Sequence, residues 1–233
     1  MLNMSSTVPS SRGEMPDLTA RARIRDAAIA RFAAVGVAAT SIRAIAAEAG
    51  VSAGLVIHHF GSKDALRVAC DQYVAAVIRD RKQRAAAAGA GLDPVAALRD
   101  AGDGPPLLRY LARTLVDGSP HVAELVDELV EDAVGYLEEG VATGLITPGD
   151  DPRGRAVVLT LWSLGSLVLH DHVNRILGTD LTGDPAELGG WAVPATEILA
   201  KGVLPVELYE RVRDAFEIGM QGEAQPQQEV IER

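Results

Sequence analysis

Apolar residues recur along most of the chain at the three- to four-residue spacing that predicts helices. In the first such segment the apolar positions share one helix face at i, i+3, i+4, i+8 and i+11, and they hold Ile24, Ala27, Ala28, Phe32 and Val35. Gly36 follows as a stop signal. We find neither the two-residue alternation of a half-buried strand nor an internal repeat, so the expected fold class is all-α.

Three further helices are predicted before residue 80, and each follows a residue that can cap it. Thr40 or Ser41 can cap a helix that is ended by Gly50. Ser52 can cap a very short helix, and Ser62 a longer one. The buried face of this longer helix is expected to hold Leu66, Cys70, Tyr73 and Val77.

Longer helices are predicted in the remaining two thirds of the chain, after a glycine- and proline-rich connection. Their expected ranges are 107–117, 121–143, 153–177, 194–201 and 205–218. The helix over 153–177 is apolar nearly all round, which indicates burial in the core of one subunit or against a second subunit.

Composition places the chain among globular proteins, with 48% hydrophobic and 23% charged residues in 233 positions. Cys70 is the single cysteine, so an intrachain disulfide and a zinc or iron–sulfur site built from cysteines are excluded. The longest nearly apolar run, over 156–169, is 14 residues and too short to span a bilayer. No secretion signal is visible, and we expect a soluble cytoplasmic protein that is not bound to a membrane.

Charge is distributed unevenly along the chain, although the formal net charge is −10. Residues 1–80 hold 9 basic and 7 acidic residues, whereas 81–233 hold 13 basic and 25 acidic ones. Within 20–67 the balance is 7 basic to 3 acidic. The segment 121–143 carries seven acidic residues and no Lys or Arg, so it cannot lie against DNA. If the chain binds a polyanion, the N-terminal third is where it would dock.

The segment over 40–60 has the form of a helix-turn-helix, in which a second short helix enters the major groove of DNA. Ala46 is small where the two helices cross, and Gly50 can adopt the left-handed conformation of a tight turn. The apolar contacts that set the crossing are expected from Ile45, Val51 and Val56. Such spacing also occurs at helix corners in proteins that do not bind DNA, so the spacing alone leaves both interpretations open.

Candidate DNA contacts follow from the residue types in this segment. Gly54 would let the backbone approach the bases, and Ala53 and Leu55 could touch a thymine methyl. Arg43 is the best candidate for a guanine contact. The residues placed for phosphate contacts are Thr40, His58, His59 and Lys63.

The stretch from Arg23 to Tyr73 resembles the N-terminal domain of TetR-type transcriptional regulators. The resemblance rests on Phe32, Gly36, Thr40, Ile45-Ala46, Gly50-Val51-Ser52, Gly54 and the run from His58 to Leu66. It implies that the DNA-contacting positions are Thr40, Arg43, Ser52, Ala53, Gly54, Leu55, His58, His59 and Lys63. One departure is Ile57, which stands where the family often has an aromatic hydroxyl, so that one contact is lost.

For the rest of the chain the resemblance implies a homodimer that packs through the helices over 153–177 and 205–218. Such a dimer would bind a palindromic operator and act as a repressor that a small apolar effector releases. The candidate effector-binding residues are Tyr110, Arg113, Tyr136, Trp162 and His170. No cofactor is expected. His170 and His172 are not expected to share a metal ion, since residues two apart point about 200° from each other on a helix.

These expectations divide the chain into four parts. A disordered tail over 1–18 precedes a helix-turn-helix DNA-binding domain over 19–66, and a helical effector-binding and dimerisation domain over 67–219 precedes a polar tail over 220–233.

Two other classes compete with a DNA-binding regulator. The first is a helical enzyme or lipid carrier, although the chain lacks the Gly-x-Ser-x-Gly, phosphate-loop and two-His-plus-carboxylate patterns. The second is a helical adaptor that binds only protein, through the acidic helix over 121–143.

Overall fold

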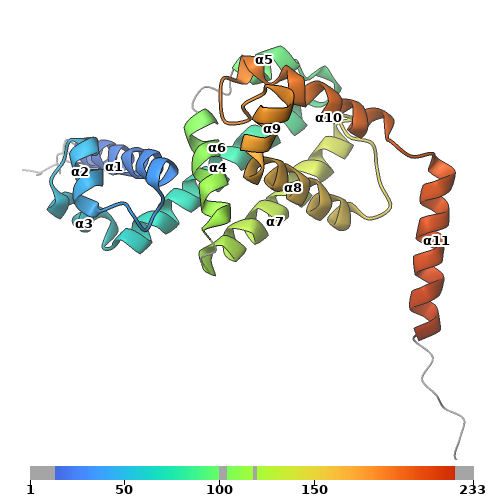
Figure 1. The fold of residues 1–233 in the computed structure, drawn as a ribbon, viewed down its shortest axis with the longest axis horizontal. Helices are drawn as coiled ribbons and strands as arrows, with labels where there is room; N and C mark the ends of the chain where they lie inside the picture. The colour runs from blue at the N-terminus through green and yellow to red at the C-terminus, as the bar shows by residue number, and fades with distance from the viewer. Residues whose placement is uncertain (1–13, 100–103, 118–119, 224–233) are drawn as a thin grey trace, which may run out of the picture. The chain divides into compact units, whose positions relative to one another are not determined.

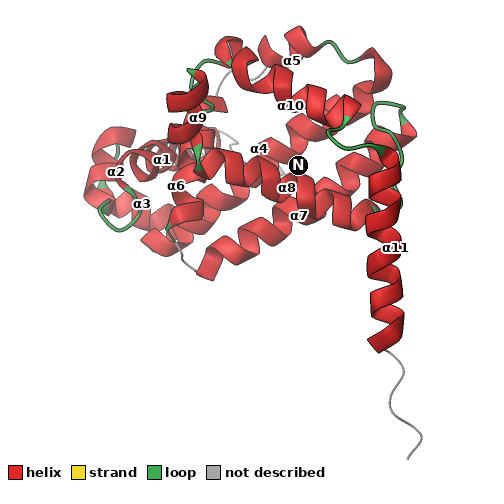
Figure 2. Ribbon diagram, turned by 45° about the vertical axis from the view of Figure 1, so that its right-hand side comes forward, coloured by secondary structure: helices red, strands yellow, loops and turns green. Residues whose placement is uncertain are grey.

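The computed structural model describes residues 14–99, 104–117 and 120–223, and every regular element in these ranges is a helix (Figures 1 and 2). The predicted all-α class is therefore confirmed. The first four helices are α1 (Glu14–Val35), α2 (Ile42–Ala49), α3 (Ala53–Phe60) and α4 (Lys63–Ala88). The others are α5 (Pro94–Arg99), α6 (Gly104–Val116), α7 (Pro120–Ala142), α8 (Pro152–Val168), α9 (His170–Leu177), α10 (Gly189–Lys201) and α11 (Val206–Glu223).

The predicted tails overlap helices at both ends of the described chain. The tail expected over 1–18 overlaps α1, which already begins at Glu14, while 1–13 lie outside the described residues. The tail expected over 220–233 overlaps the end of α11 at Glu223, and 224–233 also lie outside the described residues.

The prediction of one continuous helix over 153–177 was wrong. The segment forms two helices, α8 and α9, whose axes are bent by 73° relative to each other at Leu169. The hydroxyls of Ser163 and Ser166, just before the bend, donate hydrogen bonds to the carbonyls of Leu159 and Ser163. Such bonds compete with the regular helix ladder and favour a bend. No single described helix is long and apolar enough to cross a membrane, whereas the bent pair α8–α9 together has the necessary length and composition.

One hydrophobic core connects helices α1–α3, the head, to the body that α6, α7 and α8 form. Ile24 and Phe32 on α1, Ile45 on α2 and Val56 on α3 are completely buried within it. The ring of Phe32 lies 6.3 Å from the ring of Tyr110 on α6. The orientation of α1 to α3 is therefore set partly by contacts with the body.

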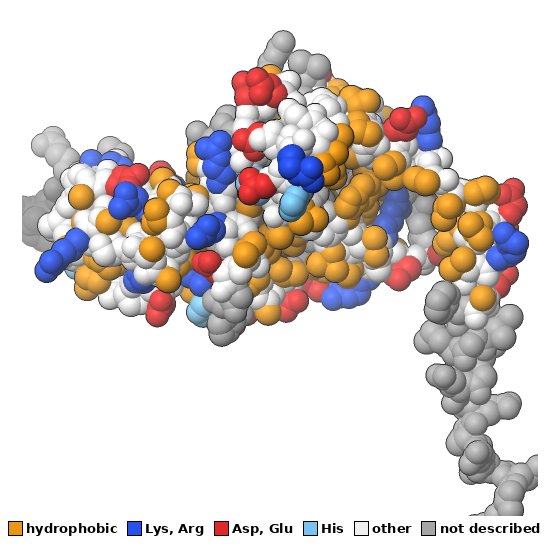
Figure 3. All heavy atoms as spheres, in the orientation of Figure 1, with side chains coloured by type: hydrophobic (Ala, Val, Ile, Leu, Met, Phe, Trp, Pro, Cys, Tyr) orange, Lys and Arg blue, Asp and Glu red, His pale blue; other side chains and the backbone are white. Residues whose placement is uncertain are grey.

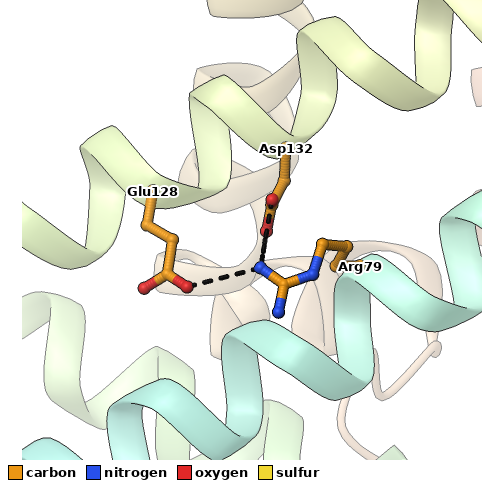
Figure 4. Close-up of polar contacts among 3 residues, drawn as sticks. All are labelled: Arg79, Glu128 and Asp132. Carbon is orange, nitrogen blue, oxygen red and sulfur yellow. Dashed lines mark hydrogen bonds and ion pairs between the residues drawn. The ribbon is translucent and has the colours of Figure 1, made fainter.

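Helix α4 begins next to α3 and continues into the body, where it packs along α7 (Figure 1). Arg79 on α4 joins the two helices, because its Nη1 lies 3.1 Å from both carboxylate oxygens of Asp132 and 3.5 Å from Oε1 of Glu128 (Figure 4). The two acidic residues stand one turn apart on α7. A partly exposed pair is worth little alone, but Arg79 reaches acids on two successive turns of α7 and so adds a polar contact between α4 and α7.

The described residues from Gly189 onward form a second compact unit that contains α10 and α11. Helix α10 begins five residues before the predicted start and includes Pro194 in its interior. Apolar residues on this unit are largely exposed, namely Val193, Ile198, Leu199, Val203, Leu204, Val206, Tyr209 and Val212.

Candidate nucleic-acid interface

Local hydrogen bonds shape the turn between α2 and α3. The side-chain oxygen of Ser41 accepts a hydrogen bond from the backbone N–H of Ala44 at 3.1 Å, and that of Ser52 accepts one from Leu55 at 3.1 Å. Both serines are therefore N-caps, which settles the choice between Thr40 and Ser41. Gly50 ends α2 with φ 65° and ψ 39°, the left-handed conformation that glycine adopts without strain.

The inner face of this helix pair is apolar, as predicted. Ile45, Ala46 and Val56 are buried, and Val51 is half-buried against them. Val56 is the one residue of α3 that is fully buried. The rest of α3 is accordingly available at the surface, which a helix that enters a groove requires.

Most of the predicted DNA contacts lie at or near the surface of this helix pair. Arg43, Ser52, Gly54 and His58 are exposed, as is Ile57, the position where the family's aromatic hydroxyl is missing. Three others are half-buried, namely Ala53, Leu55 and His59. Lys and Arg side chains also reach the surface around α1–α3 on the face drawn in Figure 3.

Thr40 and Lys63 have partners inside the protein that sequence reasoning missed. The buried hydroxyl of Thr40 donates to the carbonyl of Gly36 at 2.7 Å. The ammonium of Lys63 donates to the carbonyls of Val37 and Thr40, at 3.0 and 3.1 Å. An ammonium has three hydrogens, so Lys63 keeps one for an outside partner. Together the two side chains fasten the α1–α2 loop to the start of α4.

Two basic residues of helix α1, Arg21 and Arg31, contact other side chains of the protein. The guanidinium of Arg21 lies 5.1 Å from the centre of the Phe60 ring, and Arg31 forms a 3.5 Å ion pair with Glu48. Arg31 therefore contributes less to the positive field of the head than its charge alone suggests.

A buried polar cluster joins α4 to α6, and the sequence analysis did not identify it. The hydroxyl of Tyr110 donates to Oδ1 of Asp71 at 2.5 Å, and Nε of Arg67 lies 3.7 Å from Oδ2 of Asp71. Burial raises the pKa of Asp71, while the Tyr110 hydrogen bond and the charge of Arg67 partly oppose this rise. Burial likewise raises the pKa of Tyr110. The signal in the sequence was an acidic residue next to Cys70 on the face predicted to be buried.

The five candidate effector residues lie in different surroundings. Tyr110 is completely buried against Asp71, whereas Arg113 is exposed and lies beside Gly36, where α6 meets α1. Tyr136, Trp162 and His170 are half-buried on α7, α8 and α9.

Two family descriptions match separate parts of the chain. The description "Bacterial regulatory proteins, tetR family" matches residues 24–70, which include α2 and α3. The description "Tetracyclin repressor-like, C-terminal domain" matches residues 104–205.

Individual proteins are similar over most of the chain. The HTH-type transcriptional regulatory protein RaaS of Mycobacterium tuberculosis is 40% identical over 192 residues, which are 81% of this chain and 88% of that protein. The structure of a TetR transcriptional regulator from Chloroflexus aurantiacus is 26% identical with a TM-score of 0.52, and the match covers 80% of this chain and 97% of that one. NalD, the secondary repressor of the MexAB-OprM multidrug efflux pump in Pseudomonas aeruginosa, shares the fold at 19% identity and a TM-score of 0.50, over 82% of this chain and 98% of that one.

Proposed function

Because the chain belongs to the TetR family of bacterial regulatory proteins, we propose that it is a homodimeric repressor that binds a palindromic operator in the cytoplasm and leaves it when a small apolar effector binds. The observation that carries this proposal is that α3 lies at the surface of the protein. All of its residues except Val56 are exposed or half-buried, although the helix is strongly apolar in composition. Small and apolar side chains that stay at the surface of α3 can contact thymine methyl groups in the major groove.

In the proposed complex α3 lies in the major groove with its N-terminal residues toward the bases. Gly54 has no side chain to hold the backbone away from the bases, and Ala53 and Leu55 contact thymine methyl groups. Arg43 on α2 donates to a guanine. The phosphate contacts come from Ser52, His58, His59 and the remaining hydrogen of Lys63, while Thr40 acts through the loop that it holds.

Exposed apolar side chains on α8 and α9 support the proposed dimer. The exposed apolar positions on these two helices and at the bend between them are Val158, Leu161, Val168, Leu169, Ile176 and Leu177. A monomer rarely leaves a large apolar patch in water, and a second copy of the chain would cover it. On α11, Val206, Tyr209 and Val212 offer a further apolar stripe to such a partner. A two-fold dimer then presents two α3 helices to half-sites about 34 Å apart, or a multiple of that spacing.

Effector release requires that a change in the body reaches α3, and α4 offers the connection. Helix α4 follows α3 after Gly61 and Ser62, and it is tied to α6 by Tyr110–Asp71 and to α7 by Arg79–Asp132. A ligand that favours a different packing of α6 and α7 would therefore shift α4 and the spacing of the two heads. Tyr110, Arg113, Tyr136, Trp162 and His170 remain our candidates for the ligand contacts.

The test is selection of bound duplexes from a random DNA pool with the full chain, followed by binding of the selected duplex at increasing salt. We expect an inverted repeat, and affinity that falls steeply with salt because phosphate contacts release counterions. Indifference to every duplex at low salt would contradict the proposal.

A further inference from the structure

Ile57 is a large apolar side chain on the outward side of α3. Val56 marks the inward side of this helix, because it is completely buried. At about 100° per residue, Gly54 and His58 each lie about 160° around the helix from Val56, and Ile57 lies about 100° from it. All three of these residues are exposed, and 45% of the Ile57 surface is open to solvent. They therefore form the side of α3 that a groove would receive.

The surface of α3 has space for a methyl group beside Ile57. Side chains on a helix lean toward its N-terminus, so Ile57 leans over the turn that begins at Gly54. Gly54 has no side chain to fill that turn. Apart from adjacent residues and the helix backbone, a Cβ at Gly54 would have one described atom within 4 Å, Oγ of Ser52 at 3.8 Å. A small apolar group can therefore approach the helix backbone next to the branched side chain of Ile57.

The residue types on α3 limit what its outward side can recognise. The helix has the sequence Ala-Gly-Leu-Val-Ile-His-His-Phe, without Arg, Lys, Asn, Gln, Asp or Glu. Those are the side chains that form the characteristic hydrogen bonds to guanine, adenine and cytosine in the major groove. An apolar side chain recognises instead the methyl group on C5 of thymine, which projects into the same groove. The outward side of α3 is therefore suited to a methyl group.

An exposed apolar residue is not by itself a sign of a binding surface, because single ones are common on soluble proteins. Val35, at the end of α1, is also 45% exposed. Ile57 differs from Val35 in two respects. It lies on the outward side of the short helix after the turn, and it stands three residues after a glycine whose missing side chain leaves space beside it.

We propose that Ile57 is a specificity-determining residue that recognises the C5 methyl group of one pyrimidine in each half-site of the operator, with that methyl group in the space above Gly54. This inference rests on the proposed operator binding and deepens it, because it assigns a base to one position. The position counted in the sequence analysis as a lost hydroxyl contact becomes an apolar contact. Since 5-methylcytosine carries a methyl group on the same ring carbon, Ile57 accepts it in place of thymine and does not accept unmodified cytosine.

The test starts from the duplex that the full chain selects from a random pool. Each thymidine is replaced in turn by deoxyuridine, which lacks only the C5 methyl group and keeps the base pair. For the parent we expect affinity to fall about four-fold at one thymine in each half-site, the change that corresponds to burial of one methyl group. Replacement of that T·A pair by C·G should also weaken binding, and methylation of the new cytosine at C5 should restore about four-fold.

Ile57→Ala removes most of the side chain at an exposed position, so we expect the variant to fold as the parent does. It should bind the unmodified operator more weakly and should no longer distinguish thymidine from deoxyuridine at the assigned position. Val35→Ala is the matched control, because Val35 is exposed to the same extent and lies outside α3. It should show the deoxyuridine response of the parent.

The assignment of Ile57 is overturned if the parent responds to no deoxyuridine substitution, if Ile57→Ala keeps the response of the parent, or if Val35→Ala loses it equally. Binding that ignores methylation of the cytosine would also contradict it. If the chain selects no duplex at all, operator binding itself fails and this inference fails with it. A selected operator whose affinity does not depend on a methyl group beside Ile57 overturns the assignment alone.

Discussion

The hydroxyl of Tyr110 on α6 donates a 2.5 Å hydrogen bond to Asp71 on α4, and both side chains are buried. The two residues lie 39 positions apart in the sequence. Tyr110 also contacts Phe32 of α1 through its ring, so one side chain meets the head, the connecting helix and the body. This contact makes Tyr110 a structural residue as well as a candidate for ligand contact.

Removal of that hydroxyl tests its contribution to stability. Tyr110→Phe keeps the ring but leaves a buried carboxyl oxygen without its donor, so we expect a loss of about 1–3 kcal/mol in the free energy of unfolding. Urea unfolding followed by circular dichroism measures it. Tyr73→Phe is the control, because it keeps the ring that lies under the guanidinium of Arg25. If Tyr110→Phe and the parent are equally stable, the hydrogen bond makes no net contribution to the free energy of unfolding.

The raised pKa of Asp71 predicts a specific dependence of stability on pH. The folded protein holds this proton to a higher pH than the unfolded chain, in which the carboxyl has a pKa of about 3.9. The stability that this group contributes is therefore present below that value and is lost as the pH rises through the raised pKa. Asp71→Asn does not titrate and can still accept from Tyr110.

We therefore expect the stability of the parent, relative to Asp71→Asn, to fall as the pH rises from about 4 toward neutrality. Urea unfolding of both proteins at a series of pH values measures the difference. A difference that is constant or grows with pH would contradict the assignment of the raised pKa to Asp71.

Gly50 is predicted to be necessary for the turn between α2 and α3. A side chain at its φ of 65° costs about 1–2 kcal/mol, so Gly50→Ala should lower the unfolding free energy by that amount. Gly54→Ala is the matched control, because a Cβ there meets only Oγ of Ser52, at 3.8 Å. The control should keep its stability and lose operator affinity, since its methyl group holds α3 away from the bases.

Arg43→Ala tests the proposed guanine contact. Loss of a good base contact costs about 1–3 kcal/mol, so operator affinity should fall about ten-fold or more and discrimination at one base pair should relax. Arg84→Ala removes another exposed cation, which pairs with Asp80 on α4, and it should bind as the parent does. If Arg43→Ala binds the operator normally, another residue reads the guanine.

Leu161→Asp tests the proposed dimer face. Leu161 is 51% exposed on α8, so a carboxylate there should leave the fold of one chain intact while it places a buried charge in the interface between two chains. We expect the variant to sediment as a monomer and to lose operator affinity. Val116→Asp, at a position that is 65% exposed on α6, is the control and should remain a dimer. A parent chain that sediments as a monomer would disprove the dimer directly.

The helix-turn-helix could be predicted almost residue by residue because its determinants are local. Ser41 and Ser52 cap helices through bonds that span three residues, and Gly50 adopts the turn that only its missing side chain allows without strain. The buried positions of α2 and α3 follow from the same short spacing. Long-range pairing escaped prediction, as the internal partners of Lys63, 23 and 26 residues away, illustrate.

By itself, the sequence determined the all-α class, the caps and the apolar faces, since each depends on interactions within about one helical turn. Only the tertiary structure decided that the helix over 153–177 bends at Leu169, that Asp71 meets Tyr110, and that Ile146 packs on α7 at Gly140. These features depend on which helices pack together, and the spacing within a single helix carries no information about its neighbour.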